Sequence, residues 1–126
     1  MLDYFDVLGM LSTDERQVQS SAGDFLESEV RPDISEQWEA GEFPRELVPK
    51  LGEMGYLGAN LPRERGASGV NSIAYGLIMY ELERVDSGLR SFASVQGALV
   101  MYPILRFGSR EQKEAYLRRV DRISSD

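Results

Sequence analysis

The sequence contains neither cysteine nor histidine among its 126 residues. This absence excludes disulfides, zinc sites built on thiolate or imidazole ligands, and every Ser-His or Cys-His catalytic pair. No cluster of side chains indicates a metal site of another kind. Any chemistry must therefore use carboxylates, Lys, Tyr, Ser, Arg or a cofactor.

The chain also lacks a long hydrophobic run, a basic N-terminal region and a net positive charge. Its longest apolar run, Ile73 to Tyr80, contains a glycine and is too short to span a bilayer. The first six residues include two acidic and no basic side chains, so we expect no secretory or mitochondrial leader and a cytoplasmic location. With 21 acidic and 14 basic residues the net charge is −7, which argues against a nucleic-acid partner.

The composition is that of one soluble globular domain covering residues 1–126, with 42% hydrophobic and 28% charged residues. A chain of this size buries roughly two-thirds of the surface that its unfolded form exposes, which is enough for one hydrophobic core. We therefore expect a single domain that needs no covalent cross-link.

Capping signals and apolar spacing predict helices in the first half of the chain. Ser12 and Glu15 have the spacing of a capping box. Apolar residues then follow at steps of three and four, at Val18, Ala22, Phe25, Leu26 and Val30. A short second helix is predicted from about Pro32 to Gly41. A third, with Leu47, Val48, Leu51 and Met54 on one face, is predicted to end at Gly55, and Pro49 within it indicates a kink or a late start.

The second half begins with a long glycine-rich loop over residues 55–70. Asn71 then caps a predicted helix that Asp86-Ser87-Gly88 ends, with an apolar face at Ile73, Ala74, Leu77, Ile78, Leu82 and Val85. The next helix is predicted over residues 89–107 with Phe92, Val95, Leu99 and Ile104 on one face, a kink at Pro103 and Gly108 as the C′ residue that follows it. Ser109 and Gln112 form a second capping box before Tyr116, Leu117 and Val120. No alternating strand pattern occurs, so the fold class is all-α, a bundle-like domain of five or six helices with one long Gly-rich loop.

Polar side chains gather near the start of the helix after Gly88. Ser87, Arg90, Ser91 and Ser94 are three or four residues apart, so hydroxyls and one guanidinium share a face close to a helix N-terminus. Arg presents a planar fork that fits a carboxylate, and the spacing allows Glu83 to orient it. In the alternative interpretation, Arg90 is a surface residue paired with Glu83 or Asp86, and the serines are small packing residues.

Other candidate sites are weaker. The loop at residues 63–69 lacks both the Gly-x-Gly-x-x-Gly spacing and the Gly-Lys-Ser/Thr ending of phosphate-binding loops. The carboxylate pairs Glu81/Glu83 and Asp14/Glu15 are close in sequence, so we interpret them as solvated faces or a capped first turn rather than as acid-base pairs. The tyrosines at 75, 80, 102 and 116 have core or interface spacing.

Three stretches carry a resemblance to a known family. The stretch GSREQKEAYL (residues 108–117) has the Gly-Ser/Thr-x-x-Gln-Lys-x-x-Tyr-Leu pattern of the acyl-CoA dehydrogenases, and ELERVDSGLRS (81–91) resembles most the glutaryl-CoA dehydrogenases within them. Upstream, FPRELVPKLGEMGYLGANLP followed by RGASGV is similar to the family's Gly-Leu-Leu-Gly and Gly-rich region, although Arg65 stands where an aromatic residue is usual. The resemblance covers about residues 10 to 120, and the sequence at 118–126 departs from the family pattern.

The resemblance implies the N-terminal α-helical domain of an FAD-dependent oxidoreductase that oxidises and decarboxylates glutaryl-CoA to crotonyl-CoA in amino-acid catabolism. In that family the catalytic Glu base lies in the C-terminal helical bundle, and most flavin contacts come from outside the first domain. We therefore expect no catalytic residue in this chain and no FAD retained by it alone. The residues carried over are those of the acyl-carboxylate recognition site: Arg90 binding the distal carboxylate, Ser94 hydrogen-bonding it, Glu83 orienting Arg90, and Ser91 and Val95 lining the pocket.

By the same resemblance the partners are an acyl-CoA substrate, an acceptor similar to electron-transfer flavoprotein, and further copies of the chain in a homotetramer. Two alternatives stay open at this point. In one alternative the chain is a non-catalytic helical interaction module. In the other it is part of another acyl-CoA dehydrogenase with a different acyl preference.

Overall fold

A computed structural model of the chain describes residues 3–65 and 67–117, and over these residues it contains helices and no strand, so the all-α prediction is confirmed. The α-helices are α1 (Thr13–Glu29), α2 (Arg31–Ala40), α3 (Leu47–Glu53), α4 (Ser72–Val85), α5 (Ser87–Ser94), α6 (Tyr102–Phe107) and α7 (Arg110–Gln112). The π-helical segments are η3 (Val95–Met101) and η4 (Lys113–Leu117), and the 3₁₀ turns are η1 (Leu8–Met10) and η2 (Arg63–Arg65).

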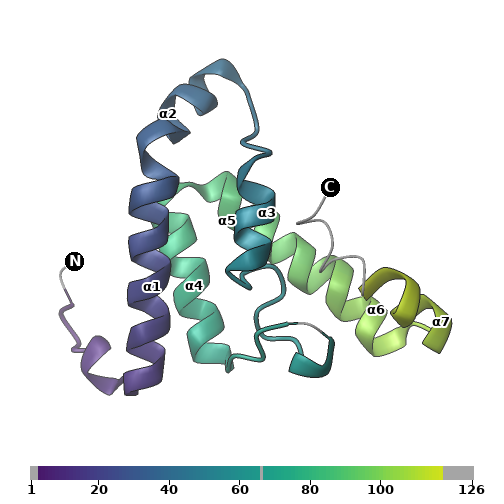
Figure 1. Ribbon diagram of the computed structural model, residues 1–126. Coiled ribbons are helices and arrows are strands. Elements are labelled where there is room, and N and C mark those ends of the chain that lie inside the picture. The colour runs from purple at the N-terminus through teal and green to yellow at the C-terminus, as the bar shows by residue number, and fades with distance from the viewer. Residues whose placement is uncertain (1–2, 66, 118–126) are drawn as a thin grey trace.

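The two longest helices, α1 and α4, lie side by side and run in the same direction (Figure 1). Both begin at the predicted caps, because the Ser12 side chain accepts from the backbone N–H of Glu15 and the Asn71 side chain accepts from that of Ala74. The Glu15 carboxylate closes the predicted capping box by accepting from the Ser12 backbone. These caps set where each helix starts, and therefore which residues of the pair face one another.

Proline and glycine residues determine where α2 and α3, the helices between α1 and α4, begin and end. Pro32 occupies the first turn of α2, where its missing N–H costs no intrahelical bond, and Gly41 ends this helix with φ of 69°. Helix α3 begins at Leu47, so Pro49 falls in its first turn and the late start, rather than a kink, is what the structure shows. Met54 does not join the buried face of α3, since it is 39% exposed just after the helix ends.

Two apolar clusters hold these elements together. The larger one joins α1, α2, α3, α4, α5 and the start of the glycine-rich loop, through Ala22, Leu26, Val30, Ile34, Leu47, Leu51, Tyr56, Leu57, Ala59, Ile78, Leu82, Leu89 and Ala93. The smaller one joins that loop to η3 and η4 through Leu61, Met101 and Leu117. The glycine-rich segment is therefore packed between the clusters and is not only a surface loop.

The predicted helix over residues 89–107 differs in three respects. It begins at Ser87, because the extended backbone of Asp86 alone separates α4 from α5. It contains the π-helical segment η3, which sequence periodicity does not reveal. It ends at Gly108 in an extended conformation, with φ of −68°, and not in the left-handed conformation common for a glycine at this position.

Several residues placed on apolar faces by their spacing lie on the surface. Ile73 is 55% exposed, Leu99 70% and Tyr116 55%, although each falls in an apolar pattern. Tyr80 and Tyr102 are also on the surface, whereas Tyr75 packs against the larger cluster. Val120 and the departure from the family pattern at residues 118–126 lie outside the described residues. Spacing identified the helices correctly but overestimated how much of each apolar face is buried.

Candidate functional site

The predicted site lies at the joint between α4 and α5. Asp86 is the only residue between the two helices, and its side chain caps α5 by accepting from the backbone N–H of Leu89 at 2.7 Å. Because the joint is a single residue, the last turn of α4 and the first turns of α5 lie next to each other. This geometry brings Glu83 within contact of Ser87 and Arg90.

Arg90 and Glu83 form a short ion pair across the joint. Arg90 Nε donates to Glu83 Oε2 at 2.6 Å, and the Ser87 hydroxyl donates to Glu83 Oε1 at 2.6 Å. The hydrogen bonds from Arg90 and then from Ser87 lower the pKa of Glu83 from its ordinary value, so this carboxylate is ionised at neutral pH. The Arg90 side chain is 37% exposed, which leaves part of the guanidinium accessible.

Ser94 lies one turn after Arg90 on the same face of α5. Arg90 Nη1 lies 3.5 Å from Ser94 Oγ, which is a long hydrogen bond, and the Ser94 hydroxyl donates to the backbone carbonyl of Ser91 at 3.0 Å. Within residues 3–65 and 67–117, Arg90 Nη2 donates to no acceptor. Two guanidinium nitrogens of Arg90 are thus available to a carboxylate, one of them shared with Ser94.

Not all of the predicted site residues contribute polar groups. Arg90, Glu83 and Ser94 are in contact, as their spacing predicts. Within the part of the chain that the structure describes, Ser91 contributes only its backbone carbonyl, to Ser94, and Val95 is a partly exposed apolar residue at the start of η3. Asp86, the other partner considered for Arg90, is used as the cap of α5.

A groove of about 590 Å³ lies beside this ion pair and was not predicted from the sequence. Its lining residues come from α2, from the segment that follows α2, and from the α4–α5 joint: Ile34, Trp38, Gly41, Glu42, Phe43, Pro44, Glu83, Val85, Asp86, Ser87 and Gly88. Phe43 reaches across to α5, with its ring centroid 5.3 Å from that of Phe92. Glu83 and Ser87 therefore line the groove while also holding Arg90.

A second cavity, of about 620 Å³, lies between α1, α4 and the glycine-rich loop. Tyr56 lines it and packs edge-on against Phe25, with 6.0 Å between ring centroids. Tyr56 is 4% exposed, and its buried hydroxyl has no hydrogen-bond partner within the described part of the chain. Burial raises the pKa of Tyr56 to about 12, so it stays neutral and cannot act as a base near neutral pH.

Two carboxylates, Glu15 and Glu81, are buried: the capped first turn predicted for Glu15 is confirmed, whereas the solvated face predicted for Glu81 is wrong. Glu15 is 8% exposed, and its second oxygen accepts from the Asn71 side chain at 2.9 Å, which links the starts of α1 and α4. Glu81 is 6% exposed and accepts from Gln19 and from Arg84, both at 3.0 Å. Periodicity did not reveal the burial of these carboxylates because one partner of each, Asn71 for Glu15 and Gln19 for Glu81, lies far away in the sequence.

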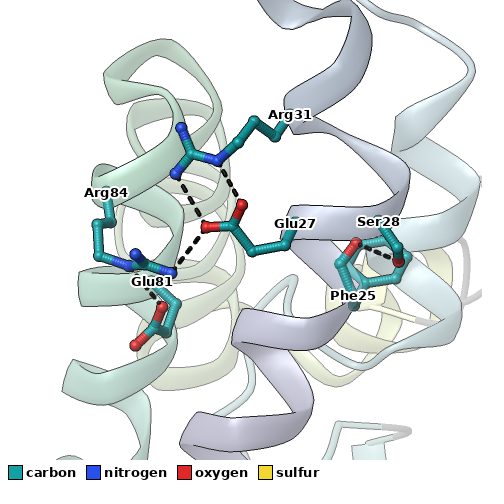
Figure 2. A network of polar contacts seen from close by, with 6 residues as sticks. All are labelled: Phe25, Glu27, Ser28, Arg31, Glu81 and Arg84. Carbon is teal, nitrogen blue, oxygen red and sulfur yellow. Dashed lines mark hydrogen bonds and ion pairs between the residues drawn. The ribbon is translucent and has the colours of Figure 1, made fainter.

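The Glu81 contacts belong to a larger network between α1 and α4. Arg84 Nη2 donates to Glu27 Oε1 at 2.9 Å, and Glu27 also accepts two hydrogen bonds from Arg31 (Figure 2). Figure 2 shows Glu27 between the two guanidinium groups, with Arg84 reaching on to Glu81. Every carboxylate in this network has its partners, so the network serves to join the two helices and offers no free acid or base.

The acidic side chains and the glycine-rich loop were the remaining places where a metal ion or a phosphate group could bind. No group of three or more Asp or Glu side chains is close enough to hold a metal ion within residues 3–65 and 67–117. The glycine-rich loop uses its polar groups internally, because Ser68 donates to the carbonyl of Gly55 and Arg63 donates to the carbonyl of Ser68. In the part of the chain that the structure describes, no helix is long and apolar enough to cross a membrane.

Comparison with known proteins gives a consistent family. The model of the acyl-CoA dehydrogenase N-terminal domain matches residues 12–122. A glutaryl-CoA dehydrogenase from Mycobacterium smegmatis, solved in complex with FADH2, superposes with a TM-score of 0.91 at 39% identity, over 97% of this chain and 31% of the other.

Curated relatives include enzymes of different activity. A 3-(aryl)acrylate reductase of Clostridium sporogenes is 34% identical over 110 residues, which cover 86% of this chain and 29% of the reductase. A subunit of the caffeyl-CoA reductase-Etf complex of Acetobacterium woodii is 33% identical over 108 residues, covering 85% of this chain and 28% of that subunit. The chain thus spans less than a third of the length of these relatives. It belongs to the acyl-CoA dehydrogenase family and carries the N-terminal domain of that family.

Proposed function

We propose that this domain supplies the acyl-carboxylate recognition site of a glutaryl-CoA dehydrogenase-like flavoenzyme. The observation that carries the proposal is the arrangement of Arg90. Its Nε donates to Glu83, its Nη1 lies near the Ser94 hydroxyl, and its Nη2 donates to no acceptor among the described residues. Arg binds carboxylates through paired N–H groups, and an acyl chain that ends in a carboxylate offers the matching acceptor. The likeness to a glutaryl-CoA dehydrogenase supports this substrate class.

In this proposal each residue of the site has a separate task. Arg90 binds the distal carboxylate, Ser94 adds a hydroxyl beside it, and Glu83 fixes the direction of the guanidinium. Ser91 and Val95 line the wall next to it. This grip places the acyl chain, and thereby its Cα–Cβ bond, relative to the rest of the enzyme.

The redox step would be carried out elsewhere in the whole protein. In the family that the sequence resembles, most flavin contacts and the Glu base that removes the α-proton lie outside the first domain, so both would come from outside this chain. The whole enzyme would oxidise and decarboxylate glutaryl-CoA to crotonyl-CoA as a homotetramer. Its electrons would pass to an acceptor of the electron-transfer flavoprotein type, which is consistent with the similarity to a subunit of an Etf complex.

The test compares two substrates in the full-length protein that carries this domain. Replacing Arg90 with alanine leaves the distal carboxylate of glutaryl-CoA without its counter-charge, so kcat/KM for this substrate should fall on the order of a hundredfold or more. Butyryl-CoA has no distal carboxylate and should be little affected. Arg110→Ala is a matched control, since Arg110 forms an exposed ion pair with Glu114 far from the site.

Equal losses for both substrates would show that Arg90 is structural and would refute the assignment. Activity on butyryl-CoA with none on glutaryl-CoA in the wild type would indicate another acyl-CoA dehydrogenase of the family. A full-length protein that binds no flavin and oxidises no acyl-CoA would indicate a non-catalytic interaction module.

A further inference from the structure

Ser87 hydrogen-bonds the carboxylate that holds Arg90 but, within the described residues, forms no side-chain hydrogen bond with Arg90. Its hydroxyl donates to Glu83 Oε1 at 2.6 Å, while Glu83 Oε2 accepts from Arg90 Nε at the same distance. Both oxygens of Glu83 are therefore engaged, one by each neighbour. Ser87 belongs to the polar face of α5, but its hydroxyl is directed back toward α4.

The local backbone leaves Ser87 without another task. The cap of α5 is the Asp86 side chain, which accepts from Leu89, so the hydroxyl of Ser87 is not needed to start the helix. Ser87 is the first residue of α5 and is exposed, so packing does not dictate its identity. Its hydrogen bond to Glu83 is the interaction that distinguishes serine from alanine here.

The consequence for Arg90 follows from the freedom of an exposed carboxylate. The Glu83 side chain is 47% exposed, and a single contact to Arg90 Nε would leave its carboxylate free to rotate and to exchange that contact for water. The second hydrogen bond, from Ser87, removes this rotation. With Glu83 fixed, the Nε bond fixes the plane of the Arg90 guanidinium, and its outer nitrogens keep one direction.

We infer that Ser87 is a positioning residue for the acyl-carboxylate site: by holding Glu83 in place, it sets the orientation of Arg90 and so the preference for acyl groups that end in a carboxylate. This inference rests on the proposed function of Arg90. It assigns Ser87 a role through Glu83, with no contact to the substrate.

The test uses three variants of the full-length protein and two substrates. In Ser87→Ala, kcat/KM for glutaryl-CoA should fall about three- to tenfold, the size expected for one hydrogen bond, and the fall should come from KM rather than kcat. Butyryl-CoA kinetics should be unchanged. Ser87→Thr keeps the hydroxyl and should restore the wild-type KM for glutaryl-CoA. Ser28→Ala is the control, since Ser28 is an exposed serine on α1 that donates to the carbonyl of Phe25.

Each remaining outcome would overturn the inference. If Ser87→Ala leaves glutaryl-CoA kinetics unchanged, affects both substrates equally, or is not rescued by threonine, Ser87 does not position Arg90. Arg90→Ala, measured in the same series, separates the two failures. Selective loss of glutaryl-CoA activity in Arg90→Ala, without an effect of Ser87→Ala, would overturn the inference alone, whereas a non-selective Arg90→Ala would refute the proposed function as well.

Discussion

The buried carboxylate of Glu81 should contribute far more to stability than that of Glu83, although both lie on α4 and each pairs with an arginine. In Glu81→Ala, Gln19 loses its acceptor and Arg84 loses one of two carboxylates, while Glu27 still compensates the arginine. One neutral and one charge-assisted hydrogen bond are lost, and Arg84 is 43% exposed, so we expect a destabilisation of about 2–3 kcal/mol. For a chain of this length about 4 °C of Tm corresponds to 1 kcal/mol, so Tm should fall by about 8–12 °C.

Glu83→Ala is the matched control because it removes the same side chain two positions further along the helix. Glu83 is 47% exposed and its ion pair with Arg90 is solvated, so its loss should change Tm much less. Thermal unfolding would be followed by far-UV circular dichroism at one protein concentration and neutral pH. Equal shifts for the two variants would refute the reasoning, because burial would then not determine the contribution of the carboxylate.

Two further predictions concern the same pair of helices and the π-helical segment. In Gly76→Ala, on α4, the new Cβ would have no neighbouring atom within 4 Å, so Tm should rise by about 2–4 °C. In Gly97→Ala the new Cβ would lie 3.1 Å from Gly58 Cα, so Tm should fall. A change of Tm in the same direction for both variants in a thermal melt would contradict this reasoning. Hydrogen bonds from the backbone of Ser12 and from Asn71 lower the pKa of Glu15 below 4.5, so its stabilisation is complete above pH 4.5 and is lost as the pH falls through the lowered value. The Tm difference between wild type and Glu15→Gln should therefore shrink on acidification, and a difference that stays constant with pH would show that ionised Glu15 has no such role.

Local signals in the sequence predicted the helices well. The caps at Ser12, Asn71 and Ser109 and the stop at Gly41 depend on hydrogen bonds or backbone angles set by residues only a few positions apart. The contact between Glu83 and Arg90 is also local, because only Asp86 interrupts the helix between them. Such features can be predicted from the sequence because no distant segment decides them.

The features that could not be predicted depend on distant segments. The π-helical segment η3 lies where Gly97 approaches the backbone of Gly58 in the glycine-rich loop. The spacing of apolar residues along α5 and α6 carries no information about this contact. Glu81 is buried because Gln19 and Arg84 satisfy it, and the groove beside Glu83 forms because α2 and the segment after it lie opposite the α4–α5 joint. The arrangement of whole helices, rather than local preference, decides these features.

The parallel course of α1 and α4 places like ends of two helix dipoles together, which is unfavourable for a side-by-side pair. Negative charge between the two N-terminal ends and positive charge near the two C-terminal ends offset this repulsion. Glu15, which accepts from Asn71, provides the negative charge at the N-terminal ends. Arg31 and Arg84, which both donate to Glu27, provide the positive charge near the C-terminal ends. The charged side chains that join the helices therefore also have the signs that the helix dipoles favour at each end. In a variant with these charges exchanged, the side chains would be repelled by the helix dipoles at both ends of the pair.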